Sequence, residues 1–188
     1  QGTAHGVCGD IARIPVRDES VDLIVAGHVL YFPVNLKPWL VELRRTLRDG
    51  GVLLAATNSA NSARRLLEFH AEACRLAGHD EMARRALEPS PRDRFTLENG
   101  LEQLRGTFVD ARIHARDDDL EFASAEEALQ VYRGGLFARG AERIESAEQL
   151  EALGASLIPA MHGILKRVAA REGAIVIPRR TGAFVARR

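Results

Sequence analysis

The hydrophobic pattern at the start of the chain predicts a strand, a helix and a second strand in succession. Residues 21–26 (VDLIVA) form a short apolar run rich in β-branched side chains, which favours a strand buried on both faces, and residues 52–56 (VLLAA) have the same character. Between these runs, apolar residues recur at helical spacing: Trp39, Leu40, Leu43 and Leu47. Gly50-Gly51 then supplies the stop of the helix. A strand–helix–strand unit with parallel strands is therefore expected within residues 9–58.

Beyond this unit the pattern predicts mainly helices. One is expected over residues 63–77 and a shorter one over 81–87, and the alternation over residues 109–113 predicts a half-exposed strand. Two capping boxes, Ser124–Glu127 and Ser146–Gln149, predict helices that begin at residues 125 and 147.

Glycine and proline are expected to shape these last two helices. The first should end at Gly134-Gly135. Gly154 and Pro159 should break or bend the second. Its apolar stripe over residues 150–168 is expected to be mostly core, and two roles stay open for part of it: covering a pocket or pairing with another subunit as a homodimer.

The position of a ligand site follows from the predicted sheet. In open α/β sheets, ligands bind beyond the carboxyl ends of the strands. Residues 27–30 (GHVL) follow the first strand and residues 57–59 (TNS) follow the second. Chemistry is therefore expected at these two strand ends.

The same residues carry a resemblance to a known family. The stretches GDIARIPVRDESVDLIVAGHVLYF and LRRTLRDGGVLLAATN are similar to the middle of a class I S-adenosylmethionine-dependent methyltransferase of the small-molecule type. The matching elements, in order, are Gly9-Asp10, Ile14-Pro15-Val16, Val21-Asp22 and the turn Leu47-Arg48-Asp49-Gly50-Gly51. The resemblance implies an α/β fold: a Rossmann-like methyltransferase sheet seen from the end of the third strand onward, with a helical insertion after the fifth strand. The last strand, residues 181–188, would enter the sheet antiparallel.

The resemblance also implies a domain organisation. The chain is expected to be the C-terminal part of a single methyltransferase domain, because nothing before Asp10 resembles the family's glycine-rich turn. Residues 1–61 would form the cofactor-side core, 62–95 a helical insertion that serves as the acceptor lid, and 96–188 the remaining strands and helices. We expect this part alone to be inactive.

The site residues are also implied by the resemblance. Asp10 would accept a hydrogen bond from the adenine amine, and the Ile11 amide would meet a ring nitrogen. The backbone of Gly27 and His28, together with Leu30, would hold the methionine part of S-adenosyl-L-methionine, the expected cofactor. His28 and Tyr31 are the candidate catalytic residues.

Asp10 and His28 each have a simpler interpretation. Asp10 is also suited to cap the turn that follows it, and the two roles are compatible. His28 has the pKa of a general base, but a lone histidine is more often structural, and in-line positioning alone can drive methyl transfer.

The expected function is S-adenosylmethionine-dependent methyl transfer to a hydroxyl, amine or carbon of a small-molecule acceptor. Two alternatives stay open: another Rossmann-type enzyme, such as a nicotinamide dehydrogenase, and a non-catalytic protein-interaction relative. The glycine-rich turn of a methyltransferase or of a dehydrogenase would lie upstream, and a non-catalytic relative would lack it. The preceding sequence would therefore discriminate among these three functions.

Composition restricts the classes of binding partner that the sequence supports. Lys plus Arg and Asp plus Glu number 26 each, so charge gives no case for nucleic acid or an anionic membrane surface. No apolar run reaches the length of a membrane span. Cys8 and Cys74 lack metal-ligand spacing and fit a reducing, cytoplasmic location. The acidic run 117–119 is expected to be a solvated turn, so no metal site is predicted.

Overall fold

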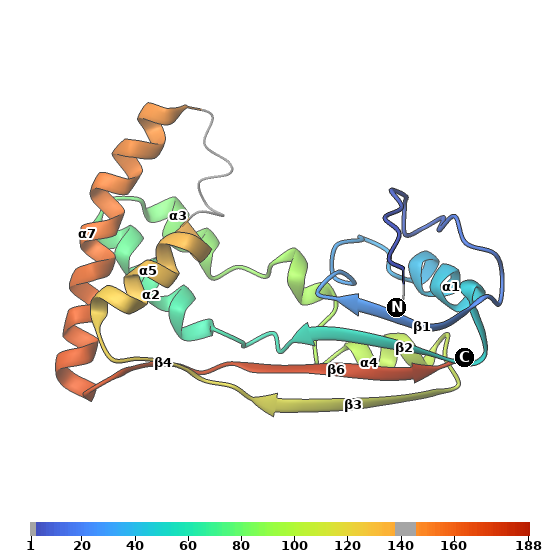
Figure 1. The fold of residues 1–188 in the computed structure, drawn as a ribbon. Helices are drawn as coiled ribbons and strands as arrows, with labels where there is room; N and C mark the ends of the chain where they lie inside the picture. Colours follow the sequence, from blue (N-terminus) through green and yellow to red (C-terminus); the bar gives the residue numbers. More distant parts are fainter. Residues whose placement is uncertain (1–2, 138–145) are drawn as a thin grey trace. The chain divides into compact units, whose positions relative to one another are not determined.

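A computed structural model describes residues 3–137 and 146–188 (Figure 1). The elements are, in order, β1 (Val21–Gly27), α1 (Lys37–Thr46), β2 (Leu47–Asn58), α2 (Arg64–Leu76), α3 (Asp80–Ala86), the 3-10 helix η1 (Pro91–Arg94), α4 (Gly100–Arg105), β3 (Asp110–Asp117), β4 (Leu120–Phe122), α5 (Ala125–Tyr132), the π-helix η2 (Arg133–Phe137), α7 (Ala147–Glu172), β5 (Ile175–Ile177) and β6 (Arg180–Arg187). They form two compact units. The first comprises the chain up to Ser62, Ser90–Asp117 and Arg180–Arg188, and the second comprises Ala63–Pro89 and Asp118–Arg179.

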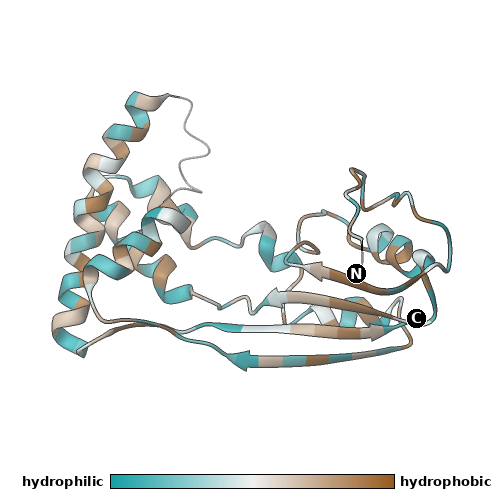
Figure 2. Ribbon diagram, viewed as in Figure 1, coloured by the Kyte–Doolittle hydropathy of each residue, from teal (hydrophilic) through white to brown (hydrophobic). Residues whose placement is uncertain are grey.

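The first unit holds a four-stranded sheet in the order β1-β2-β6-β3. β1 and β2 are parallel and are joined by α1, whereas β6 is antiparallel to both of its neighbours. The predicted strand–helix–strand unit, the α/β class and the antiparallel last strand are confirmed. Figure 2 shows the hydrophobic character of β1, which lies at one edge of this sheet.

One face of this sheet is covered by helices. Ala26, Leu53, Ala55 and Phe184 point to that face and share a buried cluster with Leu40 and Leu43 of α1 and Leu104 of α4.

The opposite face of β1 is open within the described part of the chain. Successive side chains of a strand alternate between faces. Leu23 is accordingly 55% exposed and Val25 64% exposed, while their neighbour Ala26 is buried. The prediction of a strand buried on both faces is therefore wrong for β1 in this structure. The apolar run is typical of a strand that is covered on both faces, but the described residues cover only one face of β1.

The second unit is mainly helical. Its buried cluster joins α2, α3, α5 and α7 to the two-stranded antiparallel sheet β4-β5. The helices expected directly after the second strand are present as α2 and α3. The assignment of residues 62–95 to an acceptor lid stays a prediction.

The two later helices begin as predicted but differ further along. The hydroxyls of Ser124 and Ser146 accept hydrogen bonds from the amides three residues on, at 3.1 Å each. The helical path does not end at Gly134-Gly135, because η2 continues through both glycines as a π-helix. Pro159 lies inside α7 without ending it. The helix is long on either side of that position, and its buried apolar residues hold it against the rest of the unit.

A buried polar group lies inside the second unit. The His70 Nδ1 atom is 2.8 Å from the Tyr132 hydroxyl, and the Cys74 sulfur is 3.6 Å from His70 Nε2. Burial lowers the pKa of His70 below its ordinary value of 6.5 and raises the pKa of Cys74 to about 11. Cys74 is therefore a protonated core thiol rather than a nucleophile.

His70 makes the stability of the second unit pH-dependent. Because its folded-state pKa is depressed, the unfolded chain binds more protons near pH 6. The stability that neutral His70 contributes to the folded unit is expected to be fully present above pH 6.5 and to be lost progressively as pH falls below that value. Urea midpoints at pH 8 and pH 5.5 should differ less in His70→Phe than in the wild type. His79→Gln, at a histidine of the same unit that lies 3.0 Å from the neutral Ser156 hydroxyl, should keep the wild-type difference; an equal loss in both variants would contradict this account.

Candidate active site

The carboxyl ends of β1 and β2 meet at one edge of the sheet. Gly27 is paired with Ala56, and the next amide, that of His28, donates to the Ala56 carbonyl at 3.0 Å. His28 then adopts a left-handed conformation with φ of 54°. This conformation costs a non-glycine residue about 1–2 kcal/mol and is favoured at ligand-binding turns. The backbone therefore leaves the sheet sharply at the predicted cofactor position, with the His28 side chain exposed.

The residues after His28 return to the core of the first unit. The side chains of Leu30 and Tyr31 are buried in the cluster beneath the sheet, whereas Phe32 is 60% exposed. The rings of Tyr31 and Phe32 lie 4.8 Å apart. Leu30 therefore has a packing role whether or not its backbone borders a cofactor, and only the edge of Tyr31 is accessible.

Asp10 caps the turn that follows it. Its Oδ1 atom accepts from the Ala12 amide and its carbonyl accepts from the Arg13 amide, both at 2.9 Å. The capping interpretation is confirmed. The carboxylate is exposed, and its Oδ2 atom has no hydrogen-bond donor within residues 3–137 and 146–188, so it is free to accept one from a ligand. The neighbouring Ile11 packs against the cluster that contains Leu30 and Tyr31.

The predicted site residues are thus brought together in part. The backbones of Gly27 and His28 and the buried side chains of Leu30 and Tyr31 belong to one strand end, and Ile11 reaches the same core. The carboxylate of Asp10 bonds only within its own turn in the described structure. Its approach to adenine stays a prediction, as do the catalytic roles of His28 and Tyr31.

Arg45 of α1 anchors the loop that follows Asp10, and no sequence motif marks this contact. The guanidinium donates to the carbonyls of Ile14 and Val16 at 3.0 Å and pairs with Glu42 at 2.8 Å. Glu42 accepts in turn from the Ile14 amide at 2.7 Å. Hydrogen bonds from Arg45 lower the pKa of Glu42, so the carboxylate stays charged and the anchor persists at neutral pH.

The end of β2 is occupied by structural contacts. The buried Thr57 hydroxyl donates to the Phe95 carbonyl at 2.8 Å, and Glu98 accepts from the Ser59 hydroxyl and the Ala60 amide. Burial favours a raised pKa for Glu98, but these hydrogen bonds together lower it. These polar residues therefore hold the chain segment 95–98 against the strand end.

A basic segment borders Tyr31 and Phe32, and sequence reasoning did not single it out. Arg92 and Arg94 come from η1, at the end of the predicted helical insertion. The Arg92 guanidinium carbon lies 5.9 Å from the centre of the Tyr31 ring, and Arg94 Nη1 donates to the Phe32 carbonyl at 3.1 Å. These contacts place two cations beside the strand-end segment.

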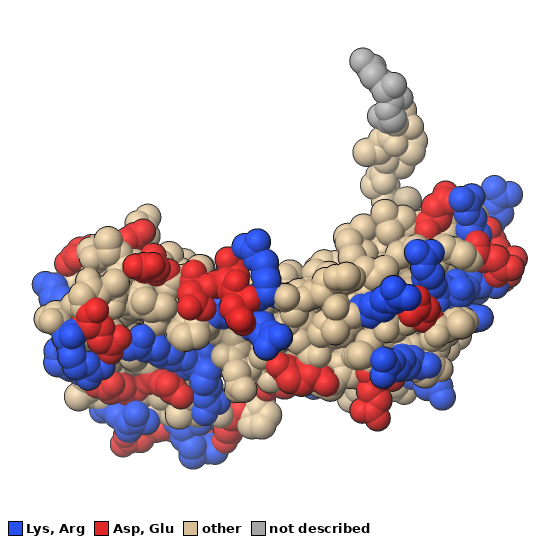
Figure 3. Space-filling view, turned by 90° about the horizontal axis from the view of Figure 1, so that it is seen from below, with Lys and Arg blue, Asp and Glu red and all other residues tan. Residues whose placement is uncertain are grey.

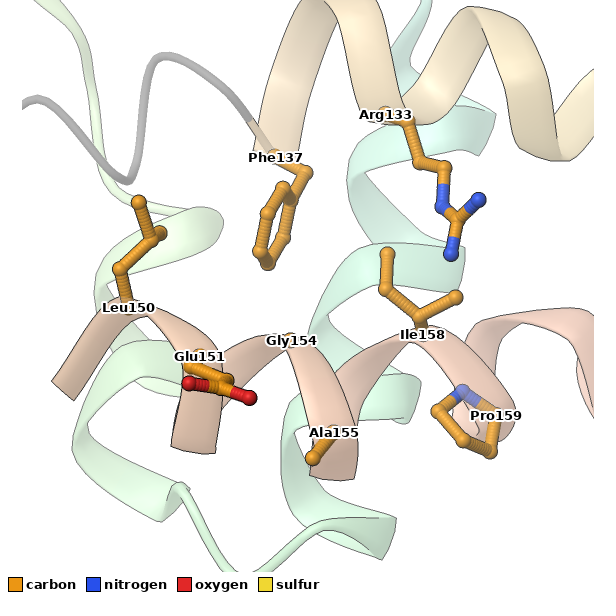
Figure 4. A pocket seen from close by; sticks show the side chains of 8 residues that line it. All are labelled: Arg133, Phe137, Leu150, Glu151, Gly154, Ala155, Ile158 and Pro159. Atoms are coloured by element: carbon orange, nitrogen blue, oxygen red, sulfur yellow. The ribbon is translucent and has the colours of Figure 1, made fainter. Parts of the chain in front are cut away.

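The second unit carries an apolar groove of about 730 Å³ between η2 and α7 (Figure 4). Phe137, Leu150 and Ile158 supply apolar side chains, while Arg133 and Glu151 supply opposite charges. None of the predicted site residues lines it.

Other expectations concern charge, metals and membranes. Figure 3 shows acidic and basic side chains intermingled on the face drawn. The part of the chain that the structure describes contains no cluster of three potential His, Cys, Asp or Glu metal ligands. It also contains no helix with the length and hydropathy of a membrane span. The cytoplasmic location, the absence of nucleic-acid partners and the homodimer stay predictions.

Comparison with known proteins places the first part of the chain in the family of the predicted resemblance. Residues 1–55 match the family described as "Methyltransferase domain". The chain is 30% identical to a malonyl-[acyl-carrier protein] O-methyltransferase of Enterobacter lignolyticus (strain SCF1) over 134 residues. These residues make up 71% of this chain and 48% of that protein. It is also 35% identical over 66 residues to the protein of the same name from Serratia marcescens, covering 35% of this chain and 26% of that protein. The chain thus spans about half or less of the length of these relatives.

A solved structure shows the same fold. The MccD protein matches 96% of this chain and 66% of its own with a TM-score of 0.50 and 14% identity. The fold is therefore that of a Rossmann-like α/β protein. The resemblance to the class I methyltransferases is confirmed, and it is carried by the segment that contains Asp10, β1, α1 and most of β2.

Proposed function

We propose that this chain is part of an S-adenosylmethionine-dependent methyltransferase whose acceptor is the free carboxylate of a malonyl group on an acyl carrier protein. The observation that carries the proposal is the 30% identity over 134 residues to an enzyme of that name. The sequence alone indicated a hydroxyl, amine or carbon of a small molecule, so this acceptor is drawn from the relatives. Neither the nicotinamide dehydrogenase nor the non-catalytic alternative gains support from them.

The described residues fit one side of the cofactor. The free Oδ2 atom of Asp10 suits the adenine amine, and the left-handed turn at His28 directs the chain away from the sheet at the position proposed for the methionine part. The sulfonium of S-adenosylmethionine supplies an electrophilic methyl carbon. The bond from that carbon to sulfur breaks, a bond to a carboxylate oxygen forms, and the sulfur keeps the electron pair, so no proton is transferred.

A further polypeptide segment is proposed to supply the glycine-rich turn that faces these residues. The open apolar face of β1 supports this proposal, because strands of parallel sheets are normally covered on both sides. On this proposal the present chain alone has no measurable turnover.

The test uses the protein translated from the whole gene. It is incubated with malonyl-acyl carrier protein and methyl-labelled S-adenosylmethionine, and the carrier protein is examined by mass spectrometry for a gain of one methyl group. Acetyl-acyl carrier protein, which lacks the free carboxylate, is the matched control. No methylation of the malonyl form, or equal methylation of both forms, would exclude the proposed acceptor.

His28 is expected to be dispensable as a base. A carboxylate acceptor is already ionised at neutral pH, so the 10²- to 10⁴-fold contribution of a general base is not required. In His28→Asn, which tolerates the left-handed backbone, kcat should fall by less than about five-fold, and the kcat profile should stay flat from pH 6 to 9. A loss of about 100-fold or more would assign His28 to proton transfer and would contradict a carboxylate acceptor.

A further inference from the structure

The 3-10 helix η1 presents its two arginines from a fixed turn. The Ser90 hydroxyl accepts from the Arg92 amide at 3.1 Å, and the Asp93 carboxylate accepts from the Ser90 amide at 2.6 Å. The Asn99 side-chain Nδ2 donates to the Asp93 carbonyl at 2.9 Å and ties the turn to the start of α4. These bonds restrict the backbone from which Arg92 and Arg94 extend, so the turn itself does not have to be ordered when their side chains bind a ligand.

Both arginines face the strand-end segment. Arg92 lies over the ring of Tyr31, and Arg94 holds the carbonyl of Phe32. Tyr31 and Phe32 follow His28 within a few residues, directly beyond the carboxyl end of β1. The two guanidinium groups therefore border the place where the proposed reaction occurs.

The charge of this pair is not neutralised by the rest of the described structure. Arg45, Arg65 and Arg84 each pair with a carboxylate within 2.8 Å. By contrast, no carboxylate in the described ranges forms an ion pair with Arg92 or Arg94, and their neighbour Asp93 is engaged by the Ser90 amide. Exposed guanidinium groups that retain free donors are suited to donate charge-assisted hydrogen bonds to a carboxylate oxygen.

We infer that Arg92, with Arg94 beside it, forms the subsite that recognises the acceptor carboxylate; this inference rests on the proposed function. Arg92 binds one carboxylate oxygen, and the other attacks the methyl carbon as described above. The anion and the sulfonium both lose their charge, and the methyl ester that forms no longer pairs with Arg92. The same contact thus selects the substrate and releases the product.

The kinetic test compares Arg92→Gln, Arg92→Lys and the control Arg105→Gln, at an exposed arginine of α4, in the protein translated from the whole gene. In Arg92→Gln, KM for malonyl-acyl carrier protein should rise about 10- to 100-fold, as expected for loss of a charged hydrogen bond. KM for S-adenosylmethionine and Tm should stay at wild-type values. Arg92→Lys should recover part of the loss, and Arg105→Gln should resemble the wild type.

A binding test separates this inference from the proposed function. Sodium malonate and neutral dimethyl malonate are titrated into this chain, and the NMR signals of the Arg92 Nε–H and the Tyr31 ring are followed. Malonate alone should shift them, and Arg92→Gln should abolish the shift.

An active wild type whose KM for the malonyl substrate is unchanged in Arg92→Gln would overturn the inference and leave the proposed function standing. If the wild type is inactive on the malonyl substrate, the proposed function fails; malonate binding that requires Arg92 would then still support the subsite, and its absence would overturn it.

Discussion

Replacing both Leu23 and Val25 by lysine is expected to leave this chain folded but to unfold the protein translated from the whole gene. The two side chains are 55% and 64% exposed here, so lysines at these positions keep their charges in water and should change the free energy of unfolding by less than about 1 kcal/mol. If a further segment covers this face of β1, the same charges are buried without partners, which costs more than about 4 kcal/mol. Urea unfolding of both chains, each with and without the two substitutions, measures the difference.

The control for this experiment is another exposed apolar residue of the first unit. Val109 is 83% exposed directly before β3, at the opposite edge of the sheet from β1, and Val109→Lys should be tolerated in both chains. Equal tolerance of the Leu23 and Val25 pair in both chains would mean that no further polypeptide covers β1. The proposal that the cofactor site is completed on that side would then be wrong.

The second large effect is expected at Asp10. Asp10→Ala removes both the cap on the Ala12 amide and the free carboxylate oxygen proposed to meet adenine. Loss of a charge-assisted hydrogen bond of about 2 kcal/mol should weaken S-adenosylmethionine binding by about 30-fold. Isothermal titration of the protein translated from the whole gene measures this change.

Asp10→Asn separates the two roles of the residue. Asparagine caps a turn about as well as aspartate, so the thermal stability of this variant should equal that of the wild type. It lacks the charge, so affinity for S-adenosylmethionine should still fall, by about ten-fold. Affinity that falls only when stability falls would show that Asp10 has no contact with the cofactor and acts solely through the turn.

The local parts of the fold were accessible from the sequence. The β-branched run of β1 and the helical spacing of α1 are each decided by neighbouring residues, and both elements appear in the structure. The predicted stop at Gly50-Gly51 is wrong, because α1 ends at Thr46, Leu47 is already extended, and both glycines lie within β2. The serine caps of α5 and α7 are equally local. The antiparallel direction of β6, in contrast, came from the family resemblance.

Features that depend on distant partners were not accessible. Arg45 holds carbonyls that precede it by about thirty residues, and no spacing rule marks that contact. The placement of Arg92 over Tyr31 is equally non-local. The glycines of η2 were expected to end a helix, but the packing of Phe137 and its neighbours in the second unit outweighs their low propensity. The exposure of Leu23 depends on what covers the strand rather than on the strand itself.

The position of β6 sets the order in which the sheet can form. β6 pairs with β2 along one side and with β3 along the other, yet it follows both of them in the sequence. Until Arg180–Arg187 is synthesised, β2 and β3 each present an unpaired edge, and unpaired apolar edges promote aggregation. Closing such long-range pairings also makes folding slow. Expression at low temperature or with a chaperone should therefore increase the yield of soluble protein, and a deletion that removes β6 should leave β3 without any partner strand.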